Sequence, residues 1–355
     1  MKIAYLLNVG AGKESGVLKK IVEQVTVWIT RGHEVKLFIQ WPDSHIWSAL
    51  QSLPVEIFPP PTRRQRYSRS SLGVPQILRW NPEIVYQRFS TFYPPYKRMM
   101  DSVPVVLEVN TDDLTEYRHQ LSWRSFTYHR LTRSLVLKRA AGLVYVTRAL
   151  AQKPYFACYG KPGIVLANGI DLSRYHLLPA PNHLQPHLAF IGTPGWPWHG
   201  VEKVVRLAQL FPEWHFDVVG YQKKDIDLTP PANLIFHGLL DGNSYQKLLA
   251  QTDVAIGTLA YHKIRMQEGC PLKLRQYLAY GLPTIIAYQD TDFPQGHPLI
   301  LQLPNTANNI DSRKEEIRQF VLRSQGKRID RASITNIDSN QKELQRLDFF
   351  QQCLP

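Results

Sequence analysis

Short apolar segments alternate with helical or polar segments along almost the whole chain, and this alternation limits the fold more than any other feature. The first group is KIAYLL, which indicates a buried strand, then the glycine-containing loop NVGAGKES, then GVLKKIVEQVTVWITRG. In this last segment apolar residues recur at helical spacing, at Val17, Ile21, Val25 and Ile29. A strand, a loop and a helix in this order are typical of the start of a nucleotide-binding parallel sheet.

The alternation continues to about residue 175. The segments EVKLFIQ, VEIF, EIVY, VPVVLEV and GLVYVT indicate further strands, and SHIWSALQSL indicates a helix between the first two of them. Repeated alternation of this kind builds parallel sheets with helices on both faces. Residues 1–175 are therefore predicted to form a doubly wound, Rossmann-like α/β domain.

A stretch without periodicity follows, at residues 172–187, and its prolines indicate a linker. Beyond it, strands are expected at LAFIG, FDVVG, LIFHG, DVAIGT and PTIIAY, and helices over 201–210 and 244–251. Residues 186–330 are predicted to form a second Rossmann-like domain, and the two sheets are expected to face a common cleft. Residues 331–355 carry Leu344, Leu347 and Phe350 at helical spacing, which predicts a closing C-terminal helix that packs on a neighbouring domain.

The charge balance favours an anionic partner. The chain has 42 Lys and Arg against 29 Asp and Glu, a formal net charge of +13. Phosphates, nucleic acid or an acidic membrane surface would suit this charge, although good solubility alone is the simpler explanation. Zinc spacing, an RNA-recognition signature and a helix-turn-helix pattern are all missing from the sequence, so nucleic acid is not the expected partner.

The three cysteines, Cys158, Cys270 and Cys353, have neither metal-site spacing nor the pattern of a disulfide framework. The N-terminal apolar run is too short for the core of a signal peptide, and no segment approaches the roughly 18 apolar residues of a membrane span. These features predict a cytoplasmic protein, and the cysteine spacing gives no sign of a bound metal; no other cofactor is expected.

The segment MQEGCPLKLRQYLAYGLPTI, residues 266–285, combines an acid, a glycine and a helix start. Pro271 suits the first position of a helix, so a helix is expected to begin at Cys270 or Pro271. Backbone N–H groups at a helix start form an anion site, and Gly269 would let the chain approach a ligand closely. A phosphate or a pyrophosphate is the expected guest.

Glu268 stands just before this helix start, where its carboxylate could accept hydrogen bonds from ligand hydroxyls. Gln276 follows about two helical turns later, so both could contact one elongated ligand, with a sugar at one end and a ribose at the other. A loop-capping Glu268, a solvated Gln276 and a surface Lys273 are the alternative.

Two Rossmann-like domains in tandem resemble the GT-B glycosyltransferases, and Glu268 with its P-x-K-x-x-x-Y-L-A-x-G-x-P continuation resembles glycosyltransferase family 4. The family has Glu, seven residues and then Glu, whereas Gln276 holds the second position here. Further segments resemble the family in order and spacing: SGVLKKIVEQVTVWITRGHEV, with Ser15 in place of a glycine before Gly16, then VLANGIDLSRY, AFIGTPGWPWHGVEKVV, IFHGLL and QTDVAIGT.

This resemblance implies a transferase that takes its sugar from a nucleotide-sugar donor, usually with retention of anomeric configuration and without a metal, as in polysaccharide biosynthesis. Glu268 would contact the donor sugar and Gln276 the ribose. The phosphates or the donor sugar would lie against the glycine loop at Gly16 and the backbone of Gly269, Cys270, Pro271 and Leu272.

The chain departs from the family at the basic residues that offset charge on the departing diphosphate. The family commonly has Arg or Lys where this chain has Thr193, and Lys where it has His199. A histidine can still donate a hydrogen bond, although its charge depends on pH. Lys273, Arg265 and Lys263 are the nearby candidates to replace the missing charge.

A second departure lies in VPVVLEVNTDD, where many family members have a histidine near the donor sugar and this chain has Asn110. Asn110 could bond a sugar hydroxyl and Glu108 could orient an acceptor, or Asn110 could simply cap the next helix. Arg88 ends another predicted strand, where it would face an acidic acceptor or would be an ordinary surface arginine.

Two basic segments stand in the domain that binds the acceptor in GT-B enzymes. TRRQRYSRS contains Arg63, Arg64, Arg66 and Arg69, and EYRHQLSWRSFTYHRLTRSLVLKR mixes basic and aromatic residues. This composition suits a lipid-linked acceptor or peripheral contact with an anionic membrane at its inner face, and an amphipathic core helix with a solvated basic face is the alternative.

The expected function is transfer of a sugar from a nucleotide-sugar donor to an unidentified acceptor, which would be a glycan, a lipid-linked molecule or a small molecule. The alternatives are a non-catalytic protein that binds sugar nucleotides, or acts as a scaffold, and a GT-B sugar-nucleotide epimerase.

Overall fold

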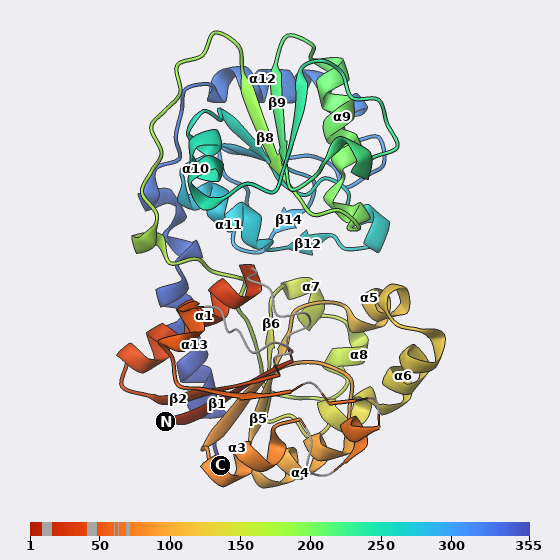
Figure 1. Cartoon of the computed structure of the whole chain (residues 1–355), viewed down its shortest axis with the longest axis vertical. Coiled ribbons are helices and arrows are strands. Elements are labelled where there is room, and N and C mark those ends of the chain that lie inside the picture. Colours follow the sequence, from red (N-terminus) through yellow and green to blue (C-terminus); the bar gives the residue numbers. More distant parts are fainter. Residues whose placement is uncertain (9–15, 41–47, 60, 63, 69–71) are drawn as a thin grey trace. The chain divides into compact units, whose positions relative to one another are not determined.

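The computed structural model describes residues 1–8, 16–40, 48–59, 61–62, 64–68 and 72–355. These residues form two compact units (Figure 1). The first unit comprises Met1–Gly169 and Ser339–Pro355, and the second comprises Ile170–Asp338. The predicted boundaries, at 175, 186 and 330, thus differ from the observed divisions by several residues, and residues 331–338 lie in the second unit.

Within its described residues the first unit contains a parallel seven-stranded sheet in the order β3-β2-β1-β4-β5-β6-β7. The strands are β1 (Lys2–Asn8), β2 (Glu34–Gln40), β3 (Val55–Phe58), β4 (Ile84–Arg88), β5 (Val105–Val109), β6 (Gly142–Tyr145) and β7 (Gly163–Val165). Every residue of β5 and β6 is buried. Such continuous apolar strands are expected where helices cover both faces of a parallel sheet.

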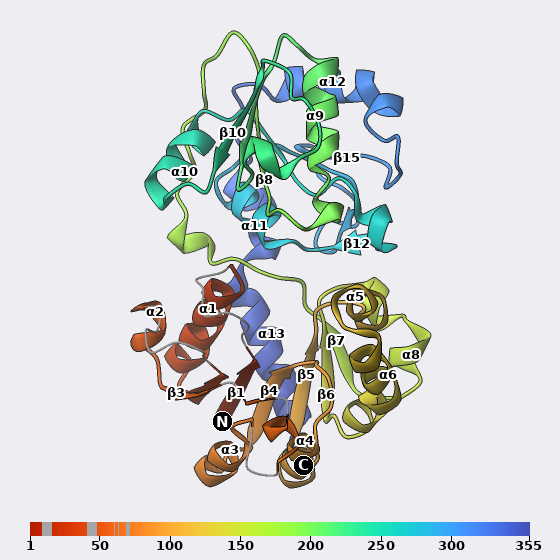
Figure 2. The ribbon, with the colours of Figure 1, turned by 45° about the vertical axis from the view of Figure 1, so that its right-hand side comes forward.

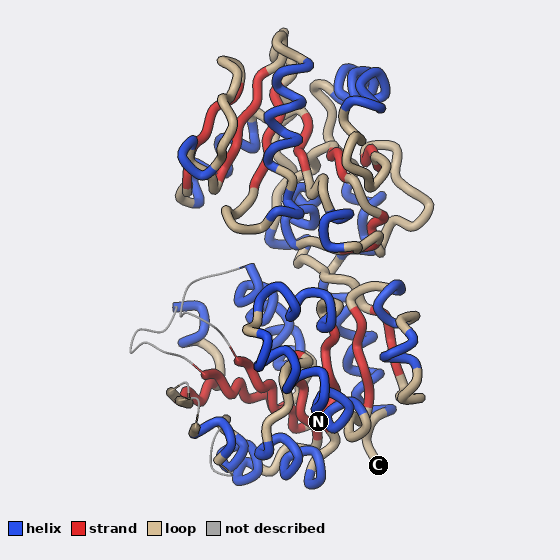
Figure 3. The backbone as a smooth tube through the Cα atoms, turned by 90° about the vertical axis from the view of Figure 1, so that its right-hand side faces the viewer, coloured by secondary structure: helices blue, strands red, loops and turns tan. Residues whose placement is uncertain are grey.

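Helices flank both faces of this sheet (Figure 3). They are α1 (Gly16–Thr30), α2 (Ser48–Gln51), α3 (Val74–Trp80), α4 (Pro94–Ser102), α5 (Asp113–Gln120), α6 (Trp123–Leu137), α7 (Arg148–Ala151), α8 (Pro154–Ala157) and α13 (Ser339–Gln352). The first part of the helix predicted at SHIWSALQSL lies outside the described residues, and α2 occupies the remainder.

The described second unit contains a parallel six-stranded sheet in the order β10-β9-β8-β11-β13-β15 and a two-stranded sheet of β12 and β14. The strands are β8 (His187–Ile191), β9 (His215–Val219), β10 (Leu234–Gly238), β11 (Val254–Ile256), β12 (Glu268–Gly269), β13 (Thr284–Ile286), β14 (Gln289–Asp290) and β15 (Ile300–Gln302). The helices are α9 (Val201–Leu210), α10 (Gly242–Ala250), α11 (Leu272–Ala279) and α12 (Lys314–Ser324). The two predicted doubly wound parallel sheets are therefore confirmed.

In both sheets the strand order reverses beside the first strand, between β1 and β4 and between β8 and β11. The loops that leave two such strands diverge to opposite faces of the sheet. Open α/β sheets bind ligands at this switch point, at the carboxyl ends of the strands. The fold thus identifies one candidate ligand edge in each unit.

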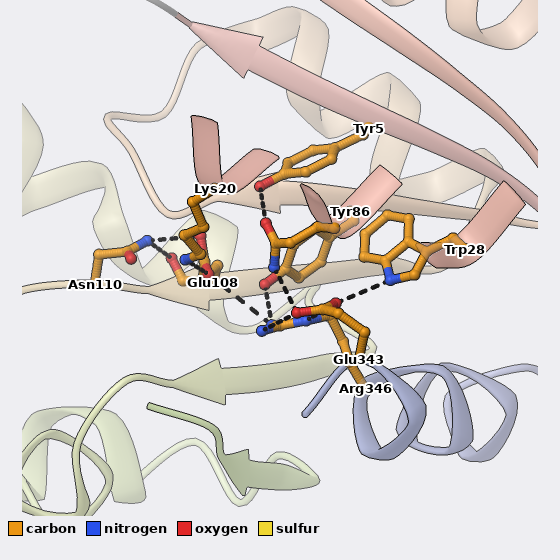
Figure 4. Close-up of polar contacts among 9 residues, drawn as sticks. Tyr5, Lys20, Trp28, Tyr86, Glu108, Asn110, Glu343 and Arg346 are labelled. Atoms are coloured by element: carbon orange, nitrogen blue, oxygen red, sulfur yellow. Dashed lines mark hydrogen bonds and ion pairs between the residues drawn. The ribbon is translucent and has the colours of Figure 1, made fainter. Parts of the chain in front are cut away.

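The C-terminal helix α13 packs against α1 of the first unit (Figure 2). Its Glu343 and Arg346 are buried and bonded to each other, with Arg346 Nε donating to Glu343 Oε2 over 2.8 Å. Gln24 Nε2 and Trp28 Nε1 of α1 donate to Glu343 over 3.0 and 2.9 Å, and Arg346 also donates to the hydroxyl of Tyr86 on β4 (Figure 4). Tertiary hydrogen bonds of α13 therefore reach both a helix and the central sheet.

We predict that Arg346→Met destabilises the protein by about 3–5 kcal/mol, because it leaves the carboxylate of Glu343 buried without its cation. Urea unfolding at neutral pH, followed by tryptophan fluorescence, measures the change. Arg313→Met is the control, since Arg313 meets Glu316 over 3.5 Å at the surface and that pair contributes about 0–1 kcal/mol. Equal effects of the two substitutions would contradict the buried network.

Candidate functional site

Tyr277 of α11 marks the switch point of the second unit. Its hydroxyl accepts a hydrogen bond from Ile191 N over 3.0 Å and donates to Ile256 O over 3.3 Å. Ile191 ends β8 and Ile256 ends β11. One buried side chain therefore bridges the two strands whose loops diverge, and α11 is fixed to the candidate ligand edge.

Thr193 and His199 lie in the loop that leaves β8. Thr193 N donates to His199 Nδ1 over 3.2 Å, and Thr193 O accepts from the hydroxyl of Tyr221 over 2.8 Å. Both bonds restrain the loop close to the strand end. The loop then reaches Gly200, whose positive φ of 79° at the start of α9 is a conformation that glycine adopts readily.

His199 is neutral in this arrangement. A ring nitrogen that accepts a hydrogen bond carries no proton, so the single ring proton of His199 is on Nε2. Burial, with the nearby charge of Lys273, lowers the pKa of His199 from 6.5 to about 3. His199 can therefore donate one hydrogen bond to an anion, but it supplies no positive charge at neutral pH.

Lys273 supplies the charge at this edge. Its Nζ donates to Ile191 O over 3.0 Å and lies 4.6 Å from the centre of the Phe190 ring. Loss of hydrating water lowers the pKa of Lys273 to about 7, and no carboxylate of the described residues compensates for that loss. An anion beside Nζ would stabilise the charged form.

The two other candidate cations differ from Lys273 in their surroundings. Lys263 is paired with Glu202 over 2.5 Å, so its charge is already balanced. Arg265 is exposed and has a positive φ of 54° after a short 3₁₀ turn. The structure thus brings Thr193, His199 and Lys273 together at the end of β8, with Lys273 as the cation bonded to that strand.

Glu268 and Gly269 form the short strand β12, which pairs with Gln289 and Asp290 of β14. Glu268 is only 7% exposed. A Cβ on Gly269 would lie 2.6 Å from the Tyr261 ring, so this glycine makes room for an aromatic ring as well as for any ligand. Glu268 and Gly269, for which no strand was predicted, therefore form a paired strand with packed surroundings.

Helix α11 begins at Leu272, and Pro271 is its N-cap with an extended ψ of 139°. The predicted start at Cys270 or Pro271 is therefore wrong by one or two residues, since the extended backbone of Pro271 cannot belong to the first helical turn. Cys270 is buried. The helix thus starts shortly after the strand that carries Glu268.

Arg275 of α11 holds β14 in place. It is fully buried and donates to both carboxylate oxygens of Asp290 over 2.9 Å, and to Asp292 over 2.8 Å. Because Asp290 pairs with Gly269, this ion cluster connects α11 to the strand that carries Glu268. Gln276, one residue further on, accepts a hydrogen bond from the Tyr245 hydroxyl over 2.9 Å. Its carbonyl oxygen is therefore already bonded to another side chain.

Arg88, Glu108 and Asn110 gather at the ends of β4 and β5 in the first unit. Arg88 is exposed and stands opposite Glu108 in the strand register. Glu108 is buried, contacts Lys20 Nζ over 2.7 Å and accepts from Asn110 Nδ2 over 2.9 Å (Figure 4). Burial alone would raise the pKa of Glu108, but the charges of Lys20, Arg346 and Arg88 outweigh burial and lower the pKa far below its usual range.

The helix after β5 is capped by Asp112, not by Asn110. The Asp112 side chain accepts from Thr115 N over 3.3 Å and from its hydroxyl over 2.9 Å. The capping alternative for Asn110 is therefore wrong, because Asn110 bonds to Glu108 instead. Gly16 is the exposed first residue of α1, and the rest of its glycine loop, residues 9–15, lies outside the described residues.

The described residues contain no group of three or more His, Cys, Asp or Glu side chains arranged to hold a metal ion. In the same part of the chain, none of the helices has both the length and the hydropathy that crossing a bilayer requires.

Comparisons with known proteins agree with this architecture. Residues 16–174 match the model of Glycosyltransferase Family 4. A glycosyltransferase from Rickettsia africae superimposes with a TM-score of 0.70 at 14% identity, over 99% of this chain and 98% of that one. Sucrose-phosphate synthase from Thermosynechococcus elongatus gives 0.67 at 14% identity, over 99% and 98%. The chain has the GT-B fold.

A third similar structure is Anabaena HepE in complex with UDP and glucose, with a TM-score of 0.62 at 13% identity over 99% of both chains. No curated protein sequence matches. The resemblance of this GT-B chain to glycosyltransferase family 4 is thus confirmed over residues 16–174.

Several residues that shape the two sites of this GT-B chain were not predicted. Lys20 reaches Glu108 from α1, and Arg346 approaches it from α13, far away in sequence. A signal was present for Arg275, because a charged residue on a largely apolar helix requires buried partners and the QDTD segment offers two carboxylates. For Lys20, the sequence suggested only a surface lysine.

We predict that His199→Asn makes the free energy of unfolding of the GT-B chain less dependent on pH under acidic conditions. Between pH 6.5 and 3 the unfolded chain protonates this histidine and the folded chain does not, so the contribution of His199 to stability falls as the pH decreases through this range. From pH 7 to 5 the free energy of unfolding of the wild type should decrease by up to about 2 kcal/mol more than that of the variant.

Urea unfolding at the two pH values measures this difference. An asparagine oxygen can still accept the bond from Thr193 N but does not titrate. The exposed His176, replaced in the same way, should retain the wild-type profile. Identical pH dependence in wild type and His199→Asn would show that the ring is not held neutral.

Proposed function

We propose that the protein is a glycosyltransferase that moves a sugar from a nucleotide-sugar donor to a hydroxyl of an acceptor. The observation that carries this proposal is the group formed by Thr193, His199 and Lys273 beside the start of α11, at the switch point of the second unit. A half-buried lysine that contacts no carboxylate of the described residues, beside a neutral donor and a helix start, is suited to a diphosphate.

The comparisons support the donor class. HepE, which shares the fold over its whole length, binds UDP and glucose. A nucleoside diphosphate would bring negative charge to the end of β8, where the structure has Lys273 and the Nε2–H of His199. We take the second unit to hold the donor in the same manner.

In the proposed reaction the bond between the sugar C1 and the diphosphate oxygen breaks, and a bond from C1 to the acceptor oxygen forms. The diphosphate leaves with added negative charge, and the proton of the acceptor hydroxyl passes to this leaving diphosphate or to water. Lys273 and His199 would stabilise this charge from fixed positions, and such preorganised donors need no metal ion. Retention of configuration is part of the proposal and rests on the family resemblance.

Glu268 would bind hydroxyls of the donor sugar. Its backbone is fixed by the pairing of β12 with β14, which the Arg275–Asp290 pair secures. A buried carboxylate on a fixed strand can select one arrangement of hydroxyls because it loses little freedom on binding. The carbonyl oxygen of Gln276 accepts from Tyr245, and its amide nitrogen would donate to the ribose.

The first unit would hold the acceptor at the ends of β4 and β5. Glu108 stays ionised there, so it can accept hydrogen bonds, but its lowered pKa and its pairing with Lys20 make it a weak base. The amide nitrogen of Asn110 donates to Glu108, so its amide oxygen would accept a hydrogen bond from a hydroxyl of the acceptor. Arg88 would contact an acidic acceptor. A cytoplasmic role in polysaccharide synthesis at the inner face of a membrane completes this proposal.

Lys273→Met should weaken binding of a nucleoside diphosphate by at least about tenfold at pH 7, because a charge-assisted bond is lost. Calorimetric titration with UDP, GDP and ADP measures the affinity. The exposed Lys327→Met is the control and should bind like the wild type.

The pH dependence gives a second test of Lys273. Since its pKa is about 7 without ligand and an anion favours the charged form, wild-type affinity should fall as the pH rises above 7. The Lys273→Met variant should lack this decrease. A wild-type affinity that stays constant from pH 7 to pH 9 would contradict the role of Lys273.

Glu268→Ala should reduce transfer by on the order of 100-fold or more while the protein stays folded, because a contact to the reacting sugar is removed. Release of nucleoside diphosphate from a panel of nucleotide sugars, with and without simple glycoside acceptors, measures turnover. The exposed Glu315→Ala should retain activity. Wild-type turnover by Glu268→Ala would refute its role.

Binding without turnover by the wild type would favour the non-catalytic alternative, and interconversion of the donor without an acceptor would favour an epimerase.

A further inference from the structure

The outer face of α6 exposes large apolar side chains. Trp123 and Leu131 are each 73% exposed and Leu135 is 37% exposed. Singly exposed apolar residues are common on proteins, but these three belong to one helix. Helical geometry places them within an arc of roughly 120°.

Basic residues lie on the same face. Arg124, Arg130 and Lys138 are exposed and alternate with the apolar side chains. Residues 121–138 contain no Asp or Glu, so no acid on this segment neutralises them. Arg124 also stands 5.4 Å from the centre of the Trp123 ring. This face is therefore apolar and positively charged at once.

The opposite face of α6 is held rigidly by the first unit. Arg133 is buried and donates to both oxygens of Asp113 on α5 over 2.8 and 2.9 Å, and to Tyr155 O over 3.1 Å. His129 lies 2.6 Å from Asp113 as well. Contacts with the rest of the first unit thus account for the buried side chains of this predicted amphipathic helix. They do not account for the exposed Trp123 and Leu131.

The neighbouring helix α4 adds further positive charge beside α6. It contacts α6 and exposes Lys97 and Arg98. Asp101 of α4 is paired with Lys97 over 2.6 Å and with Arg139 over 3.2 Å. The surface around α6 therefore remains positive.

We propose that the outer face of α6, formed by Trp123, Arg124, Arg130, Leu131, Leu135 and Lys138, docks on an anionic lipid bilayer. Trp and Leu side chains gain free energy by entering the boundary between headgroups and acyl chains, and Arg and Lys beside them contact acidic headgroups. Nucleic acid would use the charges but would leave the leucines exposed to water. A bilayer would contact both the charged and the apolar side chains, and it can surround the curved face of one helix without a matching pocket.

This inference does not depend on the proposed transfer activity. Docking concerns the outside of the first unit, and none of the six residues belongs to the groups assigned to the donor or the acceptor. Vesicle binding can therefore be positive even if no nucleotide sugar is turned over.

The test is co-sedimentation of the full chain with vesicles at low salt. One set of vesicles is phosphatidylcholine alone and the other also contains phosphatidylglycerol. The wild type should bind the acidic vesicles and lose this binding as salt rises, since the attraction is screened. Trp123→Ser with Leu131→Ser should weaken binding to acidic vesicles by about tenfold or more, and Arg124→Gln with Arg130→Gln and Lys138→Gln should abolish the preference for acidic lipid.

Matched controls come from exposed residues of the second unit. Leu239→Ser with Leu322→Ser removes two leucines that are 92% and 52% exposed, and Lys223→Gln with Lys247→Gln and Lys327→Gln removes three charges. Both controls should bind acidic vesicles like the wild type. Equal binding of the wild type to neutral and acidic vesicles overturns the proposal, as does equal loss in the controls. Binding of a DNA or RNA oligonucleotide through the α6 residues, with no vesicle binding, overturns it too.

Discussion

The buried pair of Glu343 and Arg346 joins the end of the chain to the centre of the first unit. Through Tyr86 and the indole of Trp28 it fixes α13 against α1 and β4. Arg346 also contributes, with Lys20, the positive charge that keeps Glu108 ionised deep in the sheet. Buried charges of this kind are costly unless each is paired, so the segments that supply them must all be in place. The geometry at the ends of β4 and β5 thus depends on residues from both ends of the sequence.

The charges at the candidate site of the second unit are arranged differently. At the end of β8 one cation, Lys273, is left with only a backbone carbonyl and an aromatic ring, and the histidine beside it is neutral. Partial burial, with no carboxylate of the described residues against it, leaves that lysine ready for an anion. Nearby, Arg275 is fully compensated by Asp290 and Asp292, so it stabilises the structure rather than a ligand. The contrast between the half-buried Lys273 and the fully buried Arg275 on one helix is the basis of the proposed donor site.

Periodicity in the sequence was enough to predict both parallel sheets, and segments such as Val201–Leu210 and Leu234–Gly238 have the predicted bounds. The strand β12 was missed because two residues have no detectable alternation. Pro271 was placed inside the helix because its φ suits that position, whereas its ψ, which the sequence does not report, is extended. The ion pairs of Lys20 with Glu108 and of Arg275 with Asp290 join distant segments, so only the folded chain reveals them.

The central claim is that a nucleoside diphosphate binds at the end of β8 beside the start of α11. Hydrogen–deuterium exchange with and without UDP, GDP or ADP locates such binding directly. The account predicts that a nucleotide which binds slows exchange of backbone amides in residues 192–200 and 268–275. Protection confined to other segments, or unchanged exchange with every nucleotide, would contradict it.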